Sequence, residues 1–212
     1  DDGHGMSEID LPMALRRHAT SKLKNNNLLD INSFGFRGEA LPSLGAVGRL
    51  RIVSHKEGHG AYEITVNGGD FSNTKPAARV PGTTIELRDL FYATPARLKF
   101  LRSNKSELKA ITDAVKGLSI STPSVGFTLI DKTAGKSRML LQVQKESDDS
   151  IKAKKNRLSR ILGQEFSKNA ISLDVTRDDI NLTGYVCLPT YARASNTTVS
   201  YTHLTLPTTY GV

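Results

Sequence analysis

Residues 35–41 read Gly-Phe-Arg-Gly-Glu-Ala-Leu, a glycine-rich turn followed by residues that favour a helix. The free N–H groups and the positive dipole end at the start of a helix attract phosphate groups. Taken alone, the stretch fits an ordinary tight turn equally well. It predicts a loop that opens a short helix running from about Gly38 towards Leu44.

Two segments upstream of this turn carry groups suited to binding a nucleotide. Residues 1–6 (DDGHGM) place a carboxylate just before a flexible turn, and a carboxylate can accept a hydrogen bond from the exocyclic amine of adenine. The glycines there let the backbone approach a ligand closely. Residues 17–22 (RHATSK) supply two hydroxyls, a lysine and backbone amides. Individually, the two segments are also typical of a surface loop and of a helix end with dipole-matching cations.

The apolar patterns divide the chain into two sheet-plus-helix units that meet near residues 119–124, so the expected fold class is α+β. We expect a first helix to begin at Ser7 or Asp10 and to end within residues 17–22. Further helices are expected at 104–118, capped by Ser103 or Ser106, and at 151–162, closed by Gly163. Strands are expected at 50–55, 62–66, 84–88, 125–129 and 139–143, with a hairpin formed by 171–175 and 180–185.

The composition favours a partner that carries phosphates. The 29 lysines and arginines outnumber the 21 acidic residues, for a net charge of +8, and a basic excess attracts polyanions. No run of about 18 apolar residues occurs, which predicts no membrane contact. The single cysteine, Cys187, is expected to be a strand residue in a reducing compartment, and we expect a cytoplasmic protein. Because the sequence does not start with methionine, we expect a piece of a longer protein.

The segments at 1–6, 17–22 and 35–41, in this order and spacing, resemble the adenine-contact and lid motifs of the GHKL ATPase superfamily. The forms RHATSK and GFRGEAL, followed by DLFYATPARLKFL at 89–101, resemble the MutL family in particular. The similarity covers residues 1–198. It implies a partial GHKL (Bergerat-type) ATPase α/β sandwich at 1–120 and a partial transducer α/β domain with a ribosomal-protein-like fold at 121–198.

The resemblance also assigns roles to individual residues. Asp1 matches the aspartate that binds the adenine amine, and Thr83 matches a threonine that reaches adenine through water. Gly5 lies beside Asp1 in the pocket, while the segments at 20–22 and 37–41 match lid and loop residues near the phosphates. The nucleotide-binding residues implied in this way are Asp1, Gly5, Thr20, Ser21, Lys22, Arg37, Gly38, Glu39, Ala40, Leu41 and Thr83.

The activity implied by the resemblance is that of a DNA mismatch repair mediator that binds and hydrolyses ATP with Mg²⁺. The family's general-base glutamate and magnesium-binding asparagine would lie before residue 1, and a lysine that reaches the γ-phosphate would lie beyond Thr198. We therefore expect no measurable hydrolysis by these 212 residues.

The implied partners are a MutS-like mismatch sensor, a second copy in an ATP-dependent homodimer, and DNA bound through its backbone. Arg102 matches a basic position implicated in DNA binding, and the expected helix at 151–162 adds further cations. A solvated charged face explains that helix equally well. The expected DNA-binding residues are Arg102, Lys154, Lys155 and Arg157.

Two other functions remain possible from the residues. The chain could be a DNA-binding or interaction module whose nucleotide pocket is vestigial. It could also be another GHKL enzyme, such as a topoisomerase, although the sequence at 35–41 argues against that choice. A protein metal site is not expected, because the five histidines match no common ligand spacing.

Residues 199–212 show no cap and no regular apolar pattern. They resemble a translated sequencing-library adapter, and we expect a non-native tail; a natural threonine-rich tail is the alternative.

Overall fold

The computed structural model describes residues 1–22, 35–147, 150–178 and 180–191. The chain divides into two compact units, Asp1–Leu101 and Arg102–Val212, which we call the first and second unit and describe separately. The expected ATPase and transducer boundaries near residue 120 stay predictions. The expected adapter-like tail at 199–212 lies outside the described residues.

The first unit is built on an antiparallel sheet in which the central strand β1 is Arg49–His55. Strand β2 (Ala61–Asn67) and strand β5 (Gly82–Arg88) flank it on either side. The short strands β3 (Asp70–Phe71) and β4 (Lys75–Pro76) pair with the outer edge of β2. The three strands expected from the alternating pattern at 50–55, 62–66 and 84–88 are therefore confirmed.

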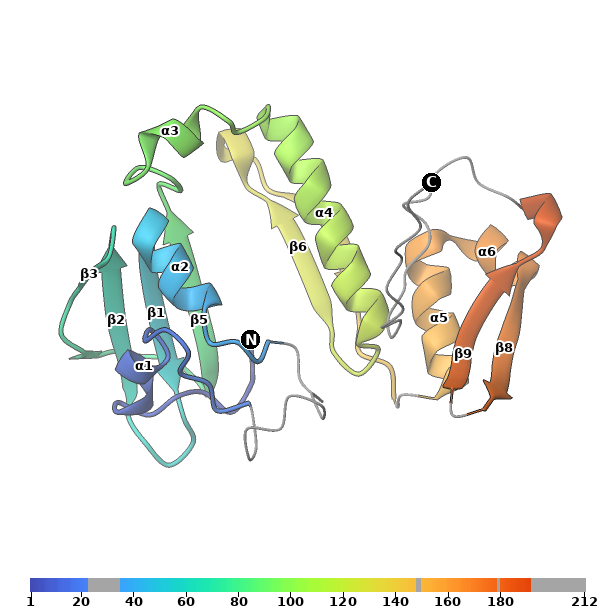
Figure 1. Ribbon diagram of the computed structural model, residues 1–212, viewed down its shortest axis with the longest axis horizontal. Helices are drawn as coiled ribbons and strands as arrows, with labels where there is room; N and C mark the ends of the chain where they lie inside the picture. Colours follow the sequence, from blue (N-terminus) through green and yellow to red (C-terminus); the bar gives the residue numbers. More distant parts are fainter. Residues whose placement is uncertain (23–34, 148–149, 179, 192–212) are drawn as a thin grey trace. The chain divides into compact units, whose positions relative to one another are not determined.

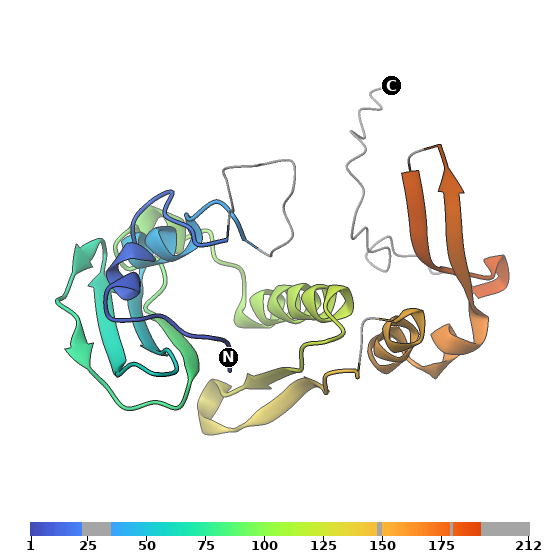
Figure 2. The ribbon, with the colours of Figure 1, turned by 90° about the horizontal axis from the view of Figure 1, so that it is seen from below.

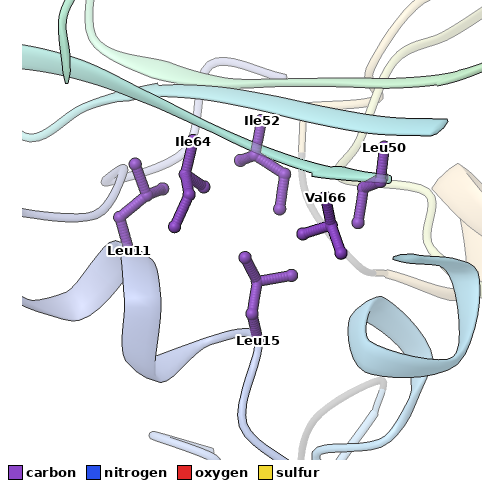
Figure 3. Close-up of a cluster of buried hydrophobic side chains, with 6 residues drawn as sticks. All are labelled: Leu11, Leu15, Leu50, Ile52, Ile64 and Val66. Atoms are coloured by element: carbon purple, nitrogen blue, oxygen red, sulfur yellow. The ribbon is translucent and has the colours of Figure 1, made fainter. Parts of the chain in front are cut away.

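Two helices, α1 (Asp10–Met13) and α2 (Ala40–Val47), cover one face of this sheet (Figures 1 and 2). Aliphatic side chains of alternate strand residues point towards them, because successive residues of a strand face opposite sides. Figure 3 shows the two leucines of the α1 region directed at this row of side chains. The buried cluster consists of Leu11, Leu15, Leu50, Ile52, Ile64 and Val66.

The first helix is much shorter than the sequence predicted, because α1 ends at Met13 rather than within residues 17–22. Beyond Met13 the chain continues in tight turns, with Leu15 N–H bonded to the Pro12 carbonyl. The amide of His18 donates to the Gly38 carbonyl at 3.0 Å instead of to a preceding turn, and His18 itself has a φ of 65°. A tertiary contact with the glycine-rich loop thus replaces the last turns of the expected helix.

The first unit closes with helix α3 (Pro95–Leu98), which carries Pro95 in its first turn. That position suits proline, because its missing N–H would have no partner inside the helix.

The second unit begins with the long helix α4 (Asn104–Ser121), whose N-cap Ser103 accepts a hydrogen bond from the Ser106 amide. An antiparallel hairpin follows, formed by β6 (Phe127–Asp131) and β7 (Arg138–Val143), with the one-turn helix η1 (Thr133–Gly135) between them. The expected helix at 104–118, its serine cap and the expected pair of strands are confirmed.

The rest of the second unit consists of helices α5 (Ile151–Leu162) and α6 (Gln164–Asn169) and a second hairpin. The hairpin pairs β8 (Ala170–Arg177) with β9 (Ile180–Cys187), and the described chain ends in the short helix η2 (Pro189–Tyr191). Val175 faces Leu182 across the hairpin, as expected, and Gly163 terminates α5 with a φ of 97°. Within the described ranges, no helix has the length and apolar character needed to cross a membrane.

Candidate functional site

The adenine-contact residues assigned by the resemblance, Asp1 and Thr83, lie side by side although 82 positions separate them in the sequence. The backbone nitrogen of Asp1 donates to the Thr83 carbonyl at 2.9 Å, and the Thr83 amide donates to the Asp1 carbonyl at 3.3 Å. This reciprocal exchange is the pattern of a hydrogen-bonded antiparallel pair. Residue 1 is therefore fixed along the free edge of β5.

The Asp1 carboxylate is also held in one orientation. Its Oδ1 accepts hydrogen bonds from the Gly3 amide at 3.0 Å and from the Thr83 amide at 3.2 Å. Both of these donors engage the same oxygen, and no donor to Oδ2 is seen among the described residues. The carboxylate is thus anchored by one oxygen and can accept a hydrogen bond with the other.

A fully buried serine that the sequence interpretation missed, Ser54, supports this pair from within the sheet. Ser54 lies opposite Thr83 in the β1–β5 register, and their hydroxyl oxygens are 2.8 Å apart. Its Oγ also accepts from the Met6 amide at 2.8 Å and donates to the Gly82 carbonyl at 3.2 Å. The sequence could have identified Ser54, because it is a polar residue at a position where the alternating pattern places an apolar, inward-facing side chain. A buried polar group must find hydrogen-bond partners.

Gly5 is required where the loop at 1–6 crosses the end of β1. Its φ is 67°, and a Cβ atom added to it would lie 2.0 Å from the carbonyl oxygen of His55. Any other residue would both strain the backbone and collide with a neighbouring strand. The expected close approach at Gly5 is therefore seen, although the contact is with the protein backbone.

The residues that the resemblance assigns to the phosphates form a second group around the glycine-rich loop. A Cβ atom on Gly38, whose φ is 62°, would lie 2.4 Å from the Ala19 carbonyl oxygen, and the His18 amide donates to the Gly38 carbonyl. The segment at 17–22 and the loop at 35–41 are therefore in direct backbone contact. Thr20 and Lys22 belong to the same group, because the Lys22 amide donates to the Thr20 hydroxyl at 3.1 Å.

Positive charge surrounds this second group. The Glu39 carboxylate forms an ion pair with Arg37 at 2.9 Å and lies 3.5 Å from Nδ1 of His18, and both of these side chains are mostly exposed. Arg16, Arg17 and Lys22 are exposed as well. The cations thus outnumber the single carboxylate, which favours an anionic ligand.

The remaining loop residues lead into α2, which starts at Ala40. The side chain of its N-cap residue, Glu39, accepts no hydrogen bond from the first amides of the helix. The first amides of such a helix lack partners within it, so they are available to an anion. Leu41 packs against the aliphatic cluster beneath. Ser21 is exposed at the end of the segment at 17–22.

The helix-covered face of the sheet is open next to the adenine-contact group. Ile85 of β5 lies opposite Ile52 and therefore on the same face as the core, yet its side chain is 48% exposed. Helix α2 packs on β1 and β2, and α1 packs on β2. Ile85 therefore presents exposed apolar surface two residues from Thr83, and such surface suits a flat purine.

The basic residues expected to bind DNA fall into two classes. Arg102 and Lys154 are exposed and Lys155 is half-buried. Arg157 is fully buried, and its guanidinium donates to the carbonyls of Ser119, Pro123, Val125 and Gln144 at 2.7–2.8 Å.

The expectation for Arg157 is therefore corrected, because a guanidinium committed to buried carbonyls cannot reach a DNA phosphate. Burial lowers the pKa of Arg157, an effect that nearby Glu146 partly opposes. Its role is to hold α5 against the end of α4 and the end of β7.

No group of three or more histidine, cysteine, aspartate or glutamate side chains is placed to hold a metal ion in the described parts of the chain.

Known proteins resemble this chain in sequence over nearly its whole length. A DNA mismatch repair protein MutL from Rhodospirillum rubrum is 47% identical over 197 residues, and one from Rhizobium etli is 48% identical over the same number. Each match covers 92% of this chain but 31% of the relative, so the chain spans about a third of the length of these relatives. No family model matches.

Solved structures resemble it in fold. The Aquifex aeolicus MutL ATPase domain complexed with ADP superposes with a TM-score of 0.61 at 24% identity, covering 82% of this chain and 58% of that one. The N-terminal domain of a DNA repair protein gives a TM-score of 0.67 at 21% identity, covering 87% and 56%. The α+β fold expected from the sequence is confirmed by these neighbours.

Proposed function

Because the chain belongs to the MutL family of DNA mismatch repair proteins, we propose that its first unit forms the adenine and phosphate sides of an ATP-binding site. The observation that carries the proposal is the pairing of Asp1 with Thr83, which anchors one carboxylate oxygen and leaves the other to accept a hydrogen bond. The exocyclic amine of adenine is a donor, whereas the same edge of guanine carries a carbonyl. The site therefore favours adenine.

The phosphate side of the proposed site is the group formed by residues 17–22 and 35–41. The contacts of Gly38 with Ala19 and of His18 with Gly38 support it, since they bring the uncapped start of α2 to the basic segment. Backbone amides at a helix start and exposed cations are the groups that cradle phosphates.

The experiment is a calorimetric titration of the full 212-residue chain with ADP and with GDP. We expect ADP to bind more tightly, and we expect Asp1→Ala to weaken ADP binding by about 10- to 100-fold, the equivalent of a hydrogen bond to a charged group of about 1.5–3 kcal/mol. Asp2→Ala is the matched control, because Asp2 is an exposed neighbour of the same type. Equal effects of the two substitutions, or no ADP binding by the unaltered chain, would contradict the proposal.

We propose that residues 1–212 bind nucleotide without turning it over. The proposal is supported by what the family resemblance implies, namely a general base and a magnesium-binding asparagine that would precede Asp1, since in-line attack on the γ-phosphate needs both. In the longer family members we propose ATP hydrolysis, ATP-dependent dimerisation and coupling of a MutS-like mismatch sensor to downstream repair. A phosphate-release assay on the 212-residue chain checks the first statement, and turnover like that of a full-length relative would overturn it.

A second function, binding of the DNA backbone by the second unit, is supported by the exposed lysines of α5, Lys152 and Lys154, together with Arg102. Removing one cation that binds a phosphate should reduce the slope of log affinity against log salt by about 0.9. We expect Lys154→Glu to weaken binding of matched and mismatched duplex equally in an anisotropy titration. Lys168→Glu is the control, since Lys168 already pairs with Glu165 at 2.8 Å. DNA binding without any ADP binding would instead favour the module with a vestigial pocket.

A further inference from the structure

Arg79 lies in the segment between β4 and β5, outside every motif that the resemblance assigns. Its Nη2 donates to the carbonyl oxygen of Asp1 at 2.5 Å, and its Nη1 donates to the hydroxyl of Thr84. Thr84 follows Thr83 in β5, so its side chain is on the opposite face of the sheet. The guanidinium of Arg79 thus reaches Asp1 from the side of the strand that faces away from the proposed pocket.

The backbone of Arg79 is fixed to the same loop through a second route. Its carbonyl oxygen lies 2.6 Å from Nδ1 of His55. The carbonyl of His55 is in turn the group that leaves no room for a side chain at Gly5. Arg79 therefore contacts the loop at residues 1–6 directly at Asp1. It also contacts His55, which in turn packs against Gly5 near the end of that loop.

Gly82 completes this arrangement at the start of β5. Its φ is 124°, and a Cβ atom there would lie 2.2 Å from the Asp1 carbonyl oxygen and 3.0 Å from Nη2 of Arg79. The absence of a side chain at Gly82 therefore leaves room for the Asp1 carbonyl and the Arg79 guanidinium to meet. A charged donor makes a stronger hydrogen bond than a neutral amide, so Arg79 fixes the peptide plane that follows Asp1 more firmly than Thr83 alone.

We propose that Arg79 is a positioning residue for adenine recognition, acting through the backbone of Asp1 without being part of the pocket. The inference rests on the proposed nucleotide-binding function. Holding the Asp1 carbonyl fixes the rotation of this residue, and therefore the direction in which its free carboxylate oxygen points. The phosphate side, formed by residues 17–22 and 35–41, has no hydrogen bond or ion pair with Arg79 within the described parts of the chain.

The test is a calorimetric comparison of ADP, GDP and pyrophosphate binding to the full chain and to Arg79→Gln. We expect Arg79→Gln to weaken ADP binding by about tenfold, as for removal of one hydrogen bond from a charged donor. GDP and pyrophosphate should bind as before, because neither uses the carboxylate of Asp1 as an acceptor for adenine. Arg79→Lys keeps a charged donor and should restore most of the ADP affinity.

Two further variants separate positioning from general destabilisation. Thr84→Val removes the hydroxyl that accepts a hydrogen bond from the guanidinium of Arg79. It should reduce the preference for ADP over GDP by less than Arg79→Gln does. Arg51→Gln makes the same chemical change in an arginine that lines the same hollow on the outer face but pairs with Glu63. It should leave the preference unchanged.

The outcomes are distinct. An equal loss of ADP, GDP and pyrophosphate binding in Arg79→Gln would overturn the inference, since it would indicate a merely structural role. Unchanged ADP affinity in Arg79→Gln would overturn it as well, while leaving the proposed function intact. Absence of ADP binding by the unaltered chain would overturn the proposed function and this inference together.

Discussion

The first unit packs around aliphatic side chains, whereas the second unit buries an arginine beside its apolar side chains. In the first, leucine, isoleucine and valine residues from α1, the turn after it, β1 and β2 form a continuous buried cluster (Figure 3). In the second, the largest fully buried side chain is Arg157, which joins α5 to four backbone carbonyls. Apolar burial is non-directional, while hydrogen bonds to a guanidinium fix both distance and direction.

The difference predicts where polar substitutions act. In the first unit the fully buried Ser54 lies at the end of the apolar row and contacts Thr83 of the proposed site. In the second unit the fully buried Arg157 is part of the scaffold itself. Polar changes in the first unit should therefore alter ligand affinity, and those in the second should alter stability.

The largest effect is expected from Arg157→Ala. The change leaves buried carbonyls without their donor and removes one of the two arginines beside Glu146, and breaking a buried charged cluster costs about 3–5 kcal/mol. Urea unfolding with hydrogen exchange should show faster exchange in α5, with little change in β1 and β2. Arg160→Ala is the control, because Arg160 is half exposed and contacts the same glutamate at 3.7 Å. Similar stability losses for the two variants would show that the buried arginine is not the organising contact.

The next effect is expected from Gly5→Ala in the first unit. The left-handed backbone costs about 1–2 kcal/mol for a residue with a Cβ atom, and the collision with His55 adds about 1–3 kcal/mol of overpacking. Gly58→Ala is matched for backbone conformation, with a φ of 78°, but has open space around it. Thermal unfolding should therefore separate the two variants. Equal melting temperatures would mean that the loop at residues 1–6 does not pack against β1.

A smaller effect is expected from Ser54→Ala. It leaves the Met6 amide without its acceptor, and an unsatisfied buried group costs about 1–3 kcal/mol. It also frees the Thr83 hydroxyl to rotate, so ADP affinity should fall along with stability. Ser72→Ala removes an acceptor from the Thr65 amide at 3.0 Å and should leave ADP affinity unchanged. A parallel loss of affinity in both variants would contradict the link between Ser54 and the site.

The smallest effect concerns the pH dependence of the second unit. Hydrogen bonds from Thr133, with help from Arg138, hold the pKa of Asp131 below its usual value of 3.8. A carboxylate with a depressed pKa stabilises the folded state above the unfolded pKa, and this contribution is lost as the pH falls through the folded pKa.

The measurement is urea unfolding of the chain and of Asp131→Asn at several pH values. The stability difference should be constant above about pH 5 and should shrink below the ordinary aspartate pKa. Thr133→Val removes the donor that contributes most and should weaken this dependence. If the stability difference between the chain and Asp131→Asn grew as the pH fell, the folded-state pKa of Asp131 would not be lowered.

Regular elements could be predicted from the sequence where one periodic pattern dominated. The alternation at Leu50, Ile52 and Ser54 predicted β1 to within one residue of its start, and Ser103 marked the start of α4. The first helix was predicted too long because a distant carbonyl, that of Gly38, takes the amide of His18. Local sequence cannot report such a contact.

The polar contacts were harder to predict, for the same reason. The charges of α5 indicated a solvated or DNA-binding face, yet Ala153 and Arg157, four residues apart, share its buried side. Family resemblance named Asp1 and Thr83, but not the groups that hold them. Ser54 and Arg79 reach the site through contacts between residues 29 and 78 positions apart, which neither spacing nor propensity encodes.

We propose that two groups of residues, 1–6 with 82–84 and 17–22 with 35–41, bind one adenine nucleotide. Hydrogen exchange of the full chain with and without saturating ADP tests it most directly. We expect slower exchange at backbone amides of both groups, with the β8–β9 hairpin unchanged. Protection of neither group, or protection confined to the second unit, would contradict it.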